Sequence, residues 1–170
     1  GRIFILLPQG WLFRGGYDAK VRDHLLNEDI IYAIIGLPPG IVNSTAIPTA
    51  LLILDKKKRP GDPIHFVDAG NLGQKRKSNH ILTSENIELI EKLAHGEQPE
   101  NYLYRAVHQP EIRKKGKNGI GGNSLSIKEY FDQIEKLELP DVDEEIDKLQ
   151  ARQLEFERAQ NALNLLLKAN

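Results

Sequence analysis

The sequence predicts an α/β fold in which an open, partly parallel sheet contains one antiparallel strand and is followed by a helical extension. Three short runs rich in Ile and Leu have the composition of strands covered on both faces: Ile3–Leu7, Ile30–Ile35 and Ala50–Leu54. Between the first two runs, the segment Asp18–Glu28 places Val21, Leu25 and Leu26 at helical spacing. A strand–helix–strand unit predicts a parallel pair of strands with a right-handed connection.

The third run is expected to return antiparallel beside the second, near the edge of the sheet. The connection Gly36–Thr49 contains two adjacent prolines and a third at Pro48, so it is a loop rather than another helix. A fourth strand is expected at Ile64–Val67. Because a basic turn with Pro and Gly separates it from the third run, these two strands are predicted to form a hairpin with a long loop.

The middle of the chain predicts one further helix. Thr83 or Ser84 is the expected N-cap, and His95-Gly96 is the expected stop. The apolar residues at helical spacing predict its buried stripe: Ile87, Leu89, Ile90 and Leu93.

The pattern weakens after this helix. A short strand is predicted at Tyr102–Val107, and a short amphipathic segment at Ser124–Tyr130. Between them, Lys114–Gly122 holds Lys and Gly with almost nothing apolar, which favours a mobile loop.

The last part of the chain, Val142–Ala169, predicts a long helix with acidic residues in its first turn. Its apolar seam is heptad-like but interrupted by Gln153 and Gln160. A helix of this length spans about 40 Å, more than a small domain covers, so it is expected to pack on a partner or, alternatively, to form an internal helical hairpin. The expected subunit-interface residues are Ile146, Leu149, Phe156, Leu163 and Leu166.

Composition limits the class of protein. The chain has 170 residues, a net charge of −1, no cysteine and no methionine. Disulfides, thiolate metal sites and cysteine nucleophiles are therefore excluded. No apolar run approaches the roughly 20 residues that cross a bilayer, so a cytoplasmic protein is expected. Because the chain opens inside an apolar strand, we expect a fragment whose missing part is N-terminal.

Two loops follow the predicted strands at the edge where such sheets bind ligands. Trp11 and Phe13 lie in the first, either packed over the sheet or as the wall of a substrate cleft. The second, Gly36–Thr49, is either a stiff connection or a wall for a flat ligand. Two basic clusters, Lys56–Arg59 and Lys75–Lys77, are either solvated turns or contacts to phosphate. The phosphate candidates are Lys56, Lys57, Lys58, Arg59, Lys75, Arg76 and Lys77.

No chemistry-bearing motif is complete. There is no Gly-rich phosphate loop and no nucleophile elbow. The five histidines share no spacing that suggests metal ligation, so no metal site is expected. The residues by themselves predict part of an α/β protein with a helical extension.

Several ordered segments resemble the modification (M) subunits of type I restriction–modification systems, which are N6-adenine DNA methyltransferases. Ile5–Gly16 is similar to their LPxGxLFRGG motif, Val21–Leu26 to an iRxxLL helix, and Ile34–Thr49 to a GLPxxxfxxTxIPT loop. Phe66–Ala69 resembles FIDAS, and Asn123–Ser126 with Tyr130 resembles NLNxxRY. The resemblance covers most of the chain and is weakest between Gly96 and Gly122.

The resemblance implies the C-terminal part of a class I, Rossmann-like methyltransferase sheet. The intact protein would bind S-adenosylmethionine and methylate an adenine flipped out of duplex DNA. The family's cofactor loop and catalytic motif precede this segment, so no catalytic or cofactor-binding residue is assigned here, and the chain alone is expected to be inactive. The base-proximal candidates are Val42, Asn43 and Thr45, with Val42 at a position where the family commonly has Phe.

The same resemblance implies an organisation and a set of partners. Residues 1–95 would be the C-terminal half of the catalytic domain, 96–139 an irregular linker with short elements, and 140–170 a long helix for subunit assembly. The partners would be DNA, a specificity subunit, a second M subunit and a restriction subunit, without a membrane. The alternative is a non-catalytic interaction module derived from a methyltransferase.

Overall fold

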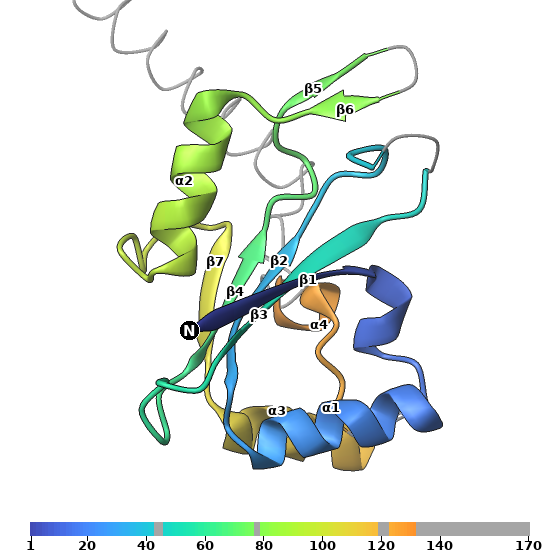
Figure 1. Ribbon diagram of the computed structural model, residues 1–170, viewed down its shortest axis with the longest axis vertical. Coiled ribbons are helices and arrows are strands. Elements are labelled where there is room, and N and C mark those ends of the chain that lie inside the picture. The colour runs from blue at the N-terminus through green and yellow to red at the C-terminus, as the bar shows by residue number, and fades with distance from the viewer. Residues whose placement is uncertain (43–45, 77–78, 119–122, 132–170) are drawn as a thin grey trace, which may run out of the picture. The chain divides into compact units, whose positions relative to one another are not determined.

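The computed structural model describes residues 1–42, 46–76, 79–118 and 123–131 (Figure 1). These residues fall in a compact unit that spans Gly1–Gln133. The final helix expected at Val142–Ala169 lies outside the described residues, and so do its five interface candidates. Within the described part of the chain, every helix is too short or too polar to cross a bilayer.

A five-stranded mixed sheet forms the centre of this unit, in the order β1-β3-β2-β4-β7. The strands are β1 (Arg2–Pro8), β3 (Thr49–Asp55), β2 (Ile31–Gly36), β4 (Ile64–Asp68) and β7 (Tyr104–Val107). Only β2 and β4 pair in parallel, and the other neighbours are antiparallel. The α/β class is confirmed, and so is the antiparallel pairing of the third strand with the second.

Two predicted pairings are wrong. β1 and β2 run in the same direction but are not neighbours, because β3 is inserted between them. β3 and β4 do not form a hairpin, because β2 lies between them and pairs with both. The physical reason is burial: five of the six residues of β2 are buried, so this strand takes the centre of the sheet.

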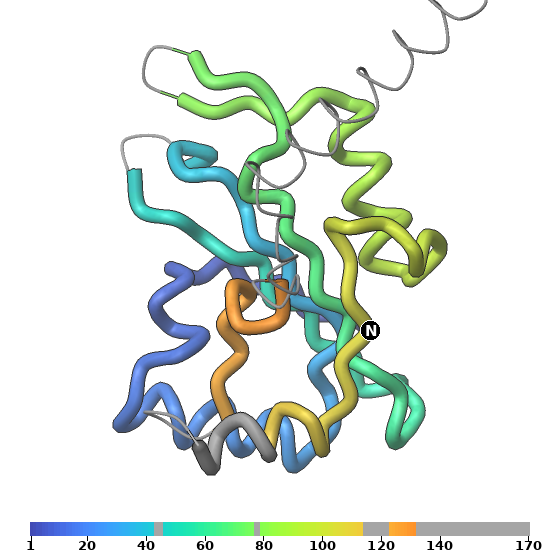
Figure 2. Tube along the Cα trace, turned by 180° about the vertical axis from the view of Figure 1, so that it is seen from behind, coloured from blue at the N-terminus to red at the C-terminus, as the bar shows by residue number. Residues whose placement is uncertain are grey.

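Helices cover both faces of the sheet (Figures 1 and 2). On one face α1 (Tyr17–Asn27), α3 (Gln109–Asn118) and α4 (Ile127–Phe131) contribute to a core that includes Phe66 and Leu52. On the other face α2 (Ser84–Ala94) packs on a core that includes Val67 and Ile53. Successive residues of β3 and β4 therefore point to opposite cores, as the pleat of a strand requires.

The helix α2 follows the predicted boundaries. Thr83 is its N-cap and forms a capping box with Asn86. The helix ends at His95, and Gly96 has a φ of 72°. The predicted stripe is wrong at Ile87, which is 56% exposed. Burial is carried instead by Ile90, Leu93 and Ala94, with Leu89 packed at the margin.

The region after Gly96 contributes to the same unit. The strand predicted at Tyr102–Val107 is confirmed as β7 and pairs with β4. The loop predicted from Lys114 is wrong as far as Asn118, because α3 includes these residues. Ile112 is fully buried and fixes α3 to the core, an apolar anchor just before the Lys-rich stretch.

Two strand elements are exposed to solvent, one at the edge of the five-stranded sheet and one outside it. The edge strand β1 exposes apolar side chains at Ile3, Phe4 and Leu6. A separate two-stranded hairpin, β5 (Gln74–Lys75) with β6 (His80–Ile81), stands beyond the main sheet (Figure 1). It follows the end of β4, next to the loop that joins β2 to β3.

Candidate functional site at the carboxyl edge of the sheet

A pocket of about 500 Å³ lies at the carboxyl edge, which we define as the edge where β1, β2 and β4 end. Three segments form it: the 3₁₀ helix η1 (Gln9–Leu12) after β1, the entry into β3, and α4. Sheets of this class place ligands at this edge. The lining residues are Gln9, Gly10, Leu12, Phe13, Ile47, Pro48, Ser126, Ile127, Lys128 and Glu129.

A buried arginine holds the first wall of the pocket. Arg22 of α1 is 0% exposed, and its guanidinium donates hydrogen bonds to the carbonyl oxygens of Trp11, Arg14 and Asn123. It also lies over the Trp11 ring, at 5.7 Å from the centroid. Burial lowers the pKa of Arg22, but an arginine stays charged at any physiological pH. The turn after β1 is thus fixed by the hydrogen bonds of the Arg22 guanidinium together with the apolar packing of Leu12 and Trp11.

Gln9 joins the first wall to the second. Its backbone N–H donates to the carbonyl of Pro48 at 2.9 Å, and its side-chain Nε2 donates to the carbonyl of Thr49 at 3.2 Å. Leu37 reinforces this crossing, since its N–H donates to the same Thr49 carbonyl at 2.9 Å. The entry into β3 therefore has a fixed position relative to η1.

The third wall is the segment Ser124–Phe131. The Leu125 N–H donates to the Leu12 carbonyl at 2.8 Å, which ties this wall to η1. Tyr130 is buried against Phe66, with ring centroids 4.4 Å apart, and its hydroxyl donates to the carbonyl of Ser124. Burial raises the pKa of Tyr130, so its phenol stays neutral. Ile127 lies so close to Gly36 that an added Cβ there would be 2.6 Å from Ile127 Cδ1.

The pocket is suited to binding rather than to bond making. Phe13 and Ile47 are 49% and 57% exposed, so apolar surface is available to a ligand. Trp11, in contrast, packs against the core. The polar groups at the rim are the Gln9 amide, the Ser126 hydroxyl, the Lys128 ammonium and the Glu129 carboxylate. Among the described residues no group of His, Asp and Glu could hold a metal ion. A flat, partly apolar ligand with polar edges fits this set of side chains.

The base-proximal candidates are only partly described. Val42 is 36% exposed on the β2–β3 loop and does not line the pocket. Asn43 and Thr45 lie outside the described residues. The same loop does reach the pocket through Ile47 and Pro48.

The structure separates the two basic clusters. Lys56, Lys57 and Arg59 are exposed on the turn after β3, at the amino edge of the sheet, which we define as the edge where β2 and β4 begin. Lys75 and Arg76 are exposed on the β5–β6 hairpin, at the carboxyl edge. Lys77 lies outside the described residues. The two clusters therefore cannot serve the same site.

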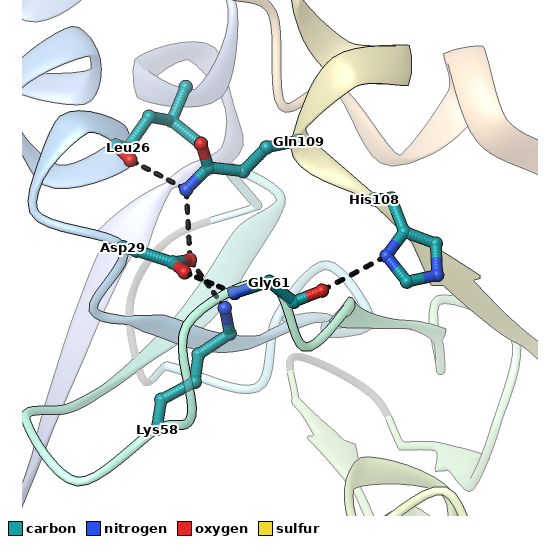
Figure 3. Close-up of polar contacts among 6 residues, drawn as sticks. All are labelled: Leu26, Asp29, Lys58, Gly61, His108 and Gln109. Atoms are coloured by element: carbon teal, nitrogen blue, oxygen red, sulfur yellow. Dashed lines mark hydrogen bonds and ion pairs between the residues drawn. The ribbon is translucent and has the colours of Figure 1, made fainter.

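Lys58 does not belong to an exposed cluster, contrary to the prediction. Its side chain is 1% exposed, and its ammonium is paired with Asp29 Oδ1 (Figure 3). Asp29, with a φ of 49°, also accepts hydrogen bonds from the Gly61 N–H and from Gln109 Nε2. Burial alone would raise the pKa of Asp29, but these hydrogen bonds and the Lys58 charge outweigh it, so the pKa lies below the ordinary value.

Sequence reasoning missed the residues that build both edges. Arg22 is a lone cation among the apolar positions of α1, which is a signal for a buried, paired charge. Asp29 follows the end of a helix in a position where φ is positive, a conformation that Asp tolerates. Gln9 carries no comparable signal, because its partners come from a segment 40 residues away.

Fold and pocket together define a mixed α/β domain with a pocket at the carboxyl edge of its strands, the edge where sheets of this type bind ligands. The family model described as N-6 DNA Methylase matches residues 1–138, and the chain belongs to this family.

Relatives and solved structures agree with this assignment. The type I restriction enzyme MjaVIII methylase subunit of Methanocaldococcus jannaschii is 33% identical over 160 residues, which is 89% of this chain and 26% of that protein. The MpnII methylase subunit of Mycoplasma pneumoniae is 30% identical over 135 residues, 78% of this chain and 25% of that protein.

A crystal structure of the type I restriction–modification methyltransferase subunit from Streptococcus thermophilus has a TM-score of 0.66 and is 33% identical. The match covers 75% of this chain and 26% of that one. The chain thus spans about a quarter of the length of the curated relatives it matches.

Proposed function

We propose that this chain is part of a type I restriction–modification methylase subunit that transfers a methyl group from S-adenosylmethionine to adenine N6 in DNA. One observation carries the proposal. Two walls of the pocket, Gln9–Phe13 and Ile47–Pro48, come from two of the segments that resemble motifs of these subunits. The family match over residues 1–138 supports it.

In this proposal the pocket forms part of the wall around the target base. An enzyme that modifies a base in a duplex must take the base out of the stack and hold it between flat or apolar side chains. Phe13 offers such a surface, and Gln9 and Ser126 offer hydrogen-bonding groups at the rim. The loop residues Val42, Asn43 and Thr45 are proposed to lie on the same side of the base.

S-adenosylmethionine is proposed to bind residues outside this chain, because the family's cofactor loop and catalytic motif precede the segment that this chain resembles. No catalytic or cofactor-binding residue is therefore assigned within it.

The proposed partners follow from the family. They are DNA, a specificity subunit, a second M subunit and a restriction subunit, in the cytoplasm. The C-terminal seam is proposed to dock on the specificity subunit through Ile146, Leu149, Phe156, Leu163 and Leu166. A pull-down that compares the full-length subunit with one ending at Leu139 tests this, since equal retention would remove the docking role.

The test of the main proposal is methyl transfer by the full-length subunit with its specificity subunit. Labelled S-adenosylmethionine and duplex DNA should give labelled adenine. Phe13→Ala should lower kcat/KM by about 5- to 150-fold, because the flipped base loses a stacking surface worth about 1–3 kcal/mol. Tyr17→Ala, at a residue 80% exposed and outside the pocket, is the matched control.

Two outcomes would contradict the proposal in different ways. Equal rates for Phe13→Ala and Tyr17→Ala would remove the pocket from the reaction. A full-length protein that assembles with the specificity subunit but transfers no methyl group would instead be the non-catalytic interaction module.

A further inference from the structure

We propose that the β5–β6 hairpin is a cationic arm that lies along the phosphate backbone of duplex DNA beside the carboxyl-edge pocket. The inference rests on the proposed function and deepens it, because it assigns DNA contact to one of two basic clusters and excludes the other. The sequence presents the two clusters as equals. The fold places them at opposite edges of the sheet (Figure 1).

The two strands of the hairpin have a defined backbone pairing. Gln74 pairs with Ile81 and Lys75 with His80, and the Arg76 N–H donates to the Asn79 carbonyl at 2.7 Å. Gly73 precedes it with a φ of 90°, and a Cβ there would collide with the Ile81 carbonyl oxygen. Only glycine permits this close return of the chain.

The hairpin is also fixed to the site. The His80 N–H donates to the Gly40 carbonyl at 2.9 Å, and Gly40 belongs to the loop between β2 and β3. That loop continues to Ile47 and Pro48, which line the pocket. Figures 1 and 2 show the hairpin and this loop side by side at the same end of the molecule. A polyanion bound to the arm would therefore pass next to the pocket.

The segment that contains the arm has no acidic residue to balance its positive charge. Lys75 and Arg76 are exposed, and no acidic residue occurs between Ala69 and Ser84. The neighbouring loop, Gly36–Thr49, has no charged residue at all. Cationic side chains without acidic neighbours create the field that attracts phosphate and releases its counterions.

The amino-edge cluster, Lys56–Arg59, does have acidic residues in and around its turn. Lys58 is buried in its pair with Asp29, and the turn is bounded by Asp55 and Asp62. Asp55 Oδ1 accepts a hydrogen bond from the Lys57 backbone N–H, while its Oδ2 is paired with Arg2 at 2.9 Å. Within the cluster the Lys58 charge is therefore compensated by Asp29, and the cluster lies away from the pocket. This cluster is a solvated turn in the present assignment.

Duplex DNA is the partner that this geometry favours. A two-stranded β-ribbon fits the major groove, and phosphates present repeated negative charge on both sides of it. Lys75 and Arg76 sit next to each other at the end of a short strand, so they can reach neighbouring phosphates. Contacts of this kind position the protein and do not read sequence.

The experiment compares two double substitutions that remove the same charge from the full-length subunit bound to its specificity subunit. One is Lys75→Gln with Arg76→Gln on the arm, and the other is Lys56→Gln with Lys57→Gln at the amino edge. The dissociation constant for duplex DNA is measured over a range of salt concentrations. The arm variant should lower the magnitude of the slope of log affinity against log salt by about 2, because each phosphate contact contributes about 0.9. The amino-edge variant should leave the slope unchanged.

Two other results would contradict the proposed contact between the hairpin and DNA. Equal changes in both variants mean that net charge, not position, controls binding. An unchanged slope in the arm variant, with or without weaker binding to the specificity subunit, means that the hairpin does not contact DNA. Methyl transfer is measured in parallel on the unsubstituted protein. If that protein binds DNA but transfers no methyl group, the proposed function fails while the salt slopes still test the arm.

Discussion

At the amino edge of the sheet, Lys58 is buried and paired with Asp29, which accepts two further hydrogen bonds (Figure 3). At the carboxyl edge, Lys75 and Arg76 are exposed without an acidic neighbour in sequence. Among the described residues, the two buried side-chain atoms without a hydrogen-bond partner, Thr49 Oγ1 and His80 Nε2, also lie at the carboxyl edge. At the amino edge the buried ion pair is satisfied within the fold, whereas the carboxyl edge combines exposed charge, exposed apolar surface and two buried polar atoms without a hydrogen-bond partner among the described residues.

This difference separates structural from functional polar residues better than residue type does. A polar group whose partners are all internal is there for folding, since its removal leaves a buried partner unpaired. A polar or apolar group without an internal partner costs free energy in the isolated domain. Such groups are common at binding sites, where the partner comes with the ligand. The predictions below test this division in order of decreasing effect.

The largest effect is expected at Arg22, which supports the carboxyl edge from inside. Arg22→Ala removes donors from three carbonyl oxygens and should lower the free energy of unfolding by about 3 kcal/mol or more. Lys20→Ala, at an exposed position of the same helix, should change it by about 0.5 kcal/mol or less. Urea denaturation of both variants measures this. Similar midpoints would show that the guanidinium does not hold η1.

A smaller effect, which depends on pH, is expected at Asp29. Asp29→Asn keeps the shape of the side chain but leaves the Lys58 ammonium buried without a counter-charge, at a cost of about 2 kcal/mol at pH 7. Because the pKa of Asp29 is lowered in the folded protein, its charge stabilises the fold above the unfolded-state pKa of about 3.9. This contribution is lost as the pH falls through the lower, folded-state pKa.

The difference in unfolding free energy between the unsubstituted chain and Asp29→Asn should therefore shrink as the pH falls from the unfolded-state pKa of about 3.9 through the lower, folded-state pKa. The control is Asp62→Asn, at an exposed aspartate of the β3–β4 turn that also contains Lys58 and Gly61. It should change the free energy of unfolding little at any pH. A difference that stays constant with pH would mean that the ion pair does not stabilise the amino edge.

Two glycines with similar backbone angles compare the two edges directly. Gly73 before the β5–β6 hairpin has a φ of 90°, and Gly61 in the amino-edge turn has a φ of 83°. A Cβ on Gly61 meets nothing within 4 Å, whereas one on Gly73 would collide with the Ile81 carbonyl oxygen. Gly73→Ala should thus cost about 1 kcal/mol more than Gly61→Ala, beyond the 1–2 kcal/mol of a positive φ. Hydrogen exchange of the His80 amide, which bonds Gly40, reports the loss locally.

Much of the fold could be predicted from local patterns. The apolar runs locate β1, β2 and β3, helical spacing locates α1, and the cap at Thr83 locates the start of α2. Strand order could not be predicted, because β3 is inserted between β1 and β2 by pairings across more than 40 residues. The loop predicted from Lys114 is helical as far as Asn118 because Ile112 packs in the core, which a composition of Lys and Gly does not reveal.

The site was predictable only in outline. The two loops after the strands were identified as ligand-facing, and both contribute to the pocket through Phe13 and Ile47. The third wall, α4, comes from a segment about 80 residues further on, and nothing local indicates its position. The basic clusters looked alike in sequence because their difference depends on Asp29, which lies 29 residues before Lys58.

The smallest effect is expected at Thr49, and its sign tests the division between the edges. Thr49 is 7% exposed at the start of β3, and its Oγ1 has no hydrogen-bond partner among the described residues. Thr49→Val replaces this hydroxyl with a methyl group and should raise the free energy of unfolding by about 0.5–1 kcal/mol, because the cost of burying an unpaired hydroxyl disappears. Thr83→Val, which removes the cap of α2, should lower it by about 1 kcal/mol. Destabilisation by both substitutions would show that the Thr49 hydroxyl has a partner within the fold. A more stable Thr49→Val domain, together with weaker methyl transfer by the full-length subunit, would assign that hydroxyl to the complex with its ligand.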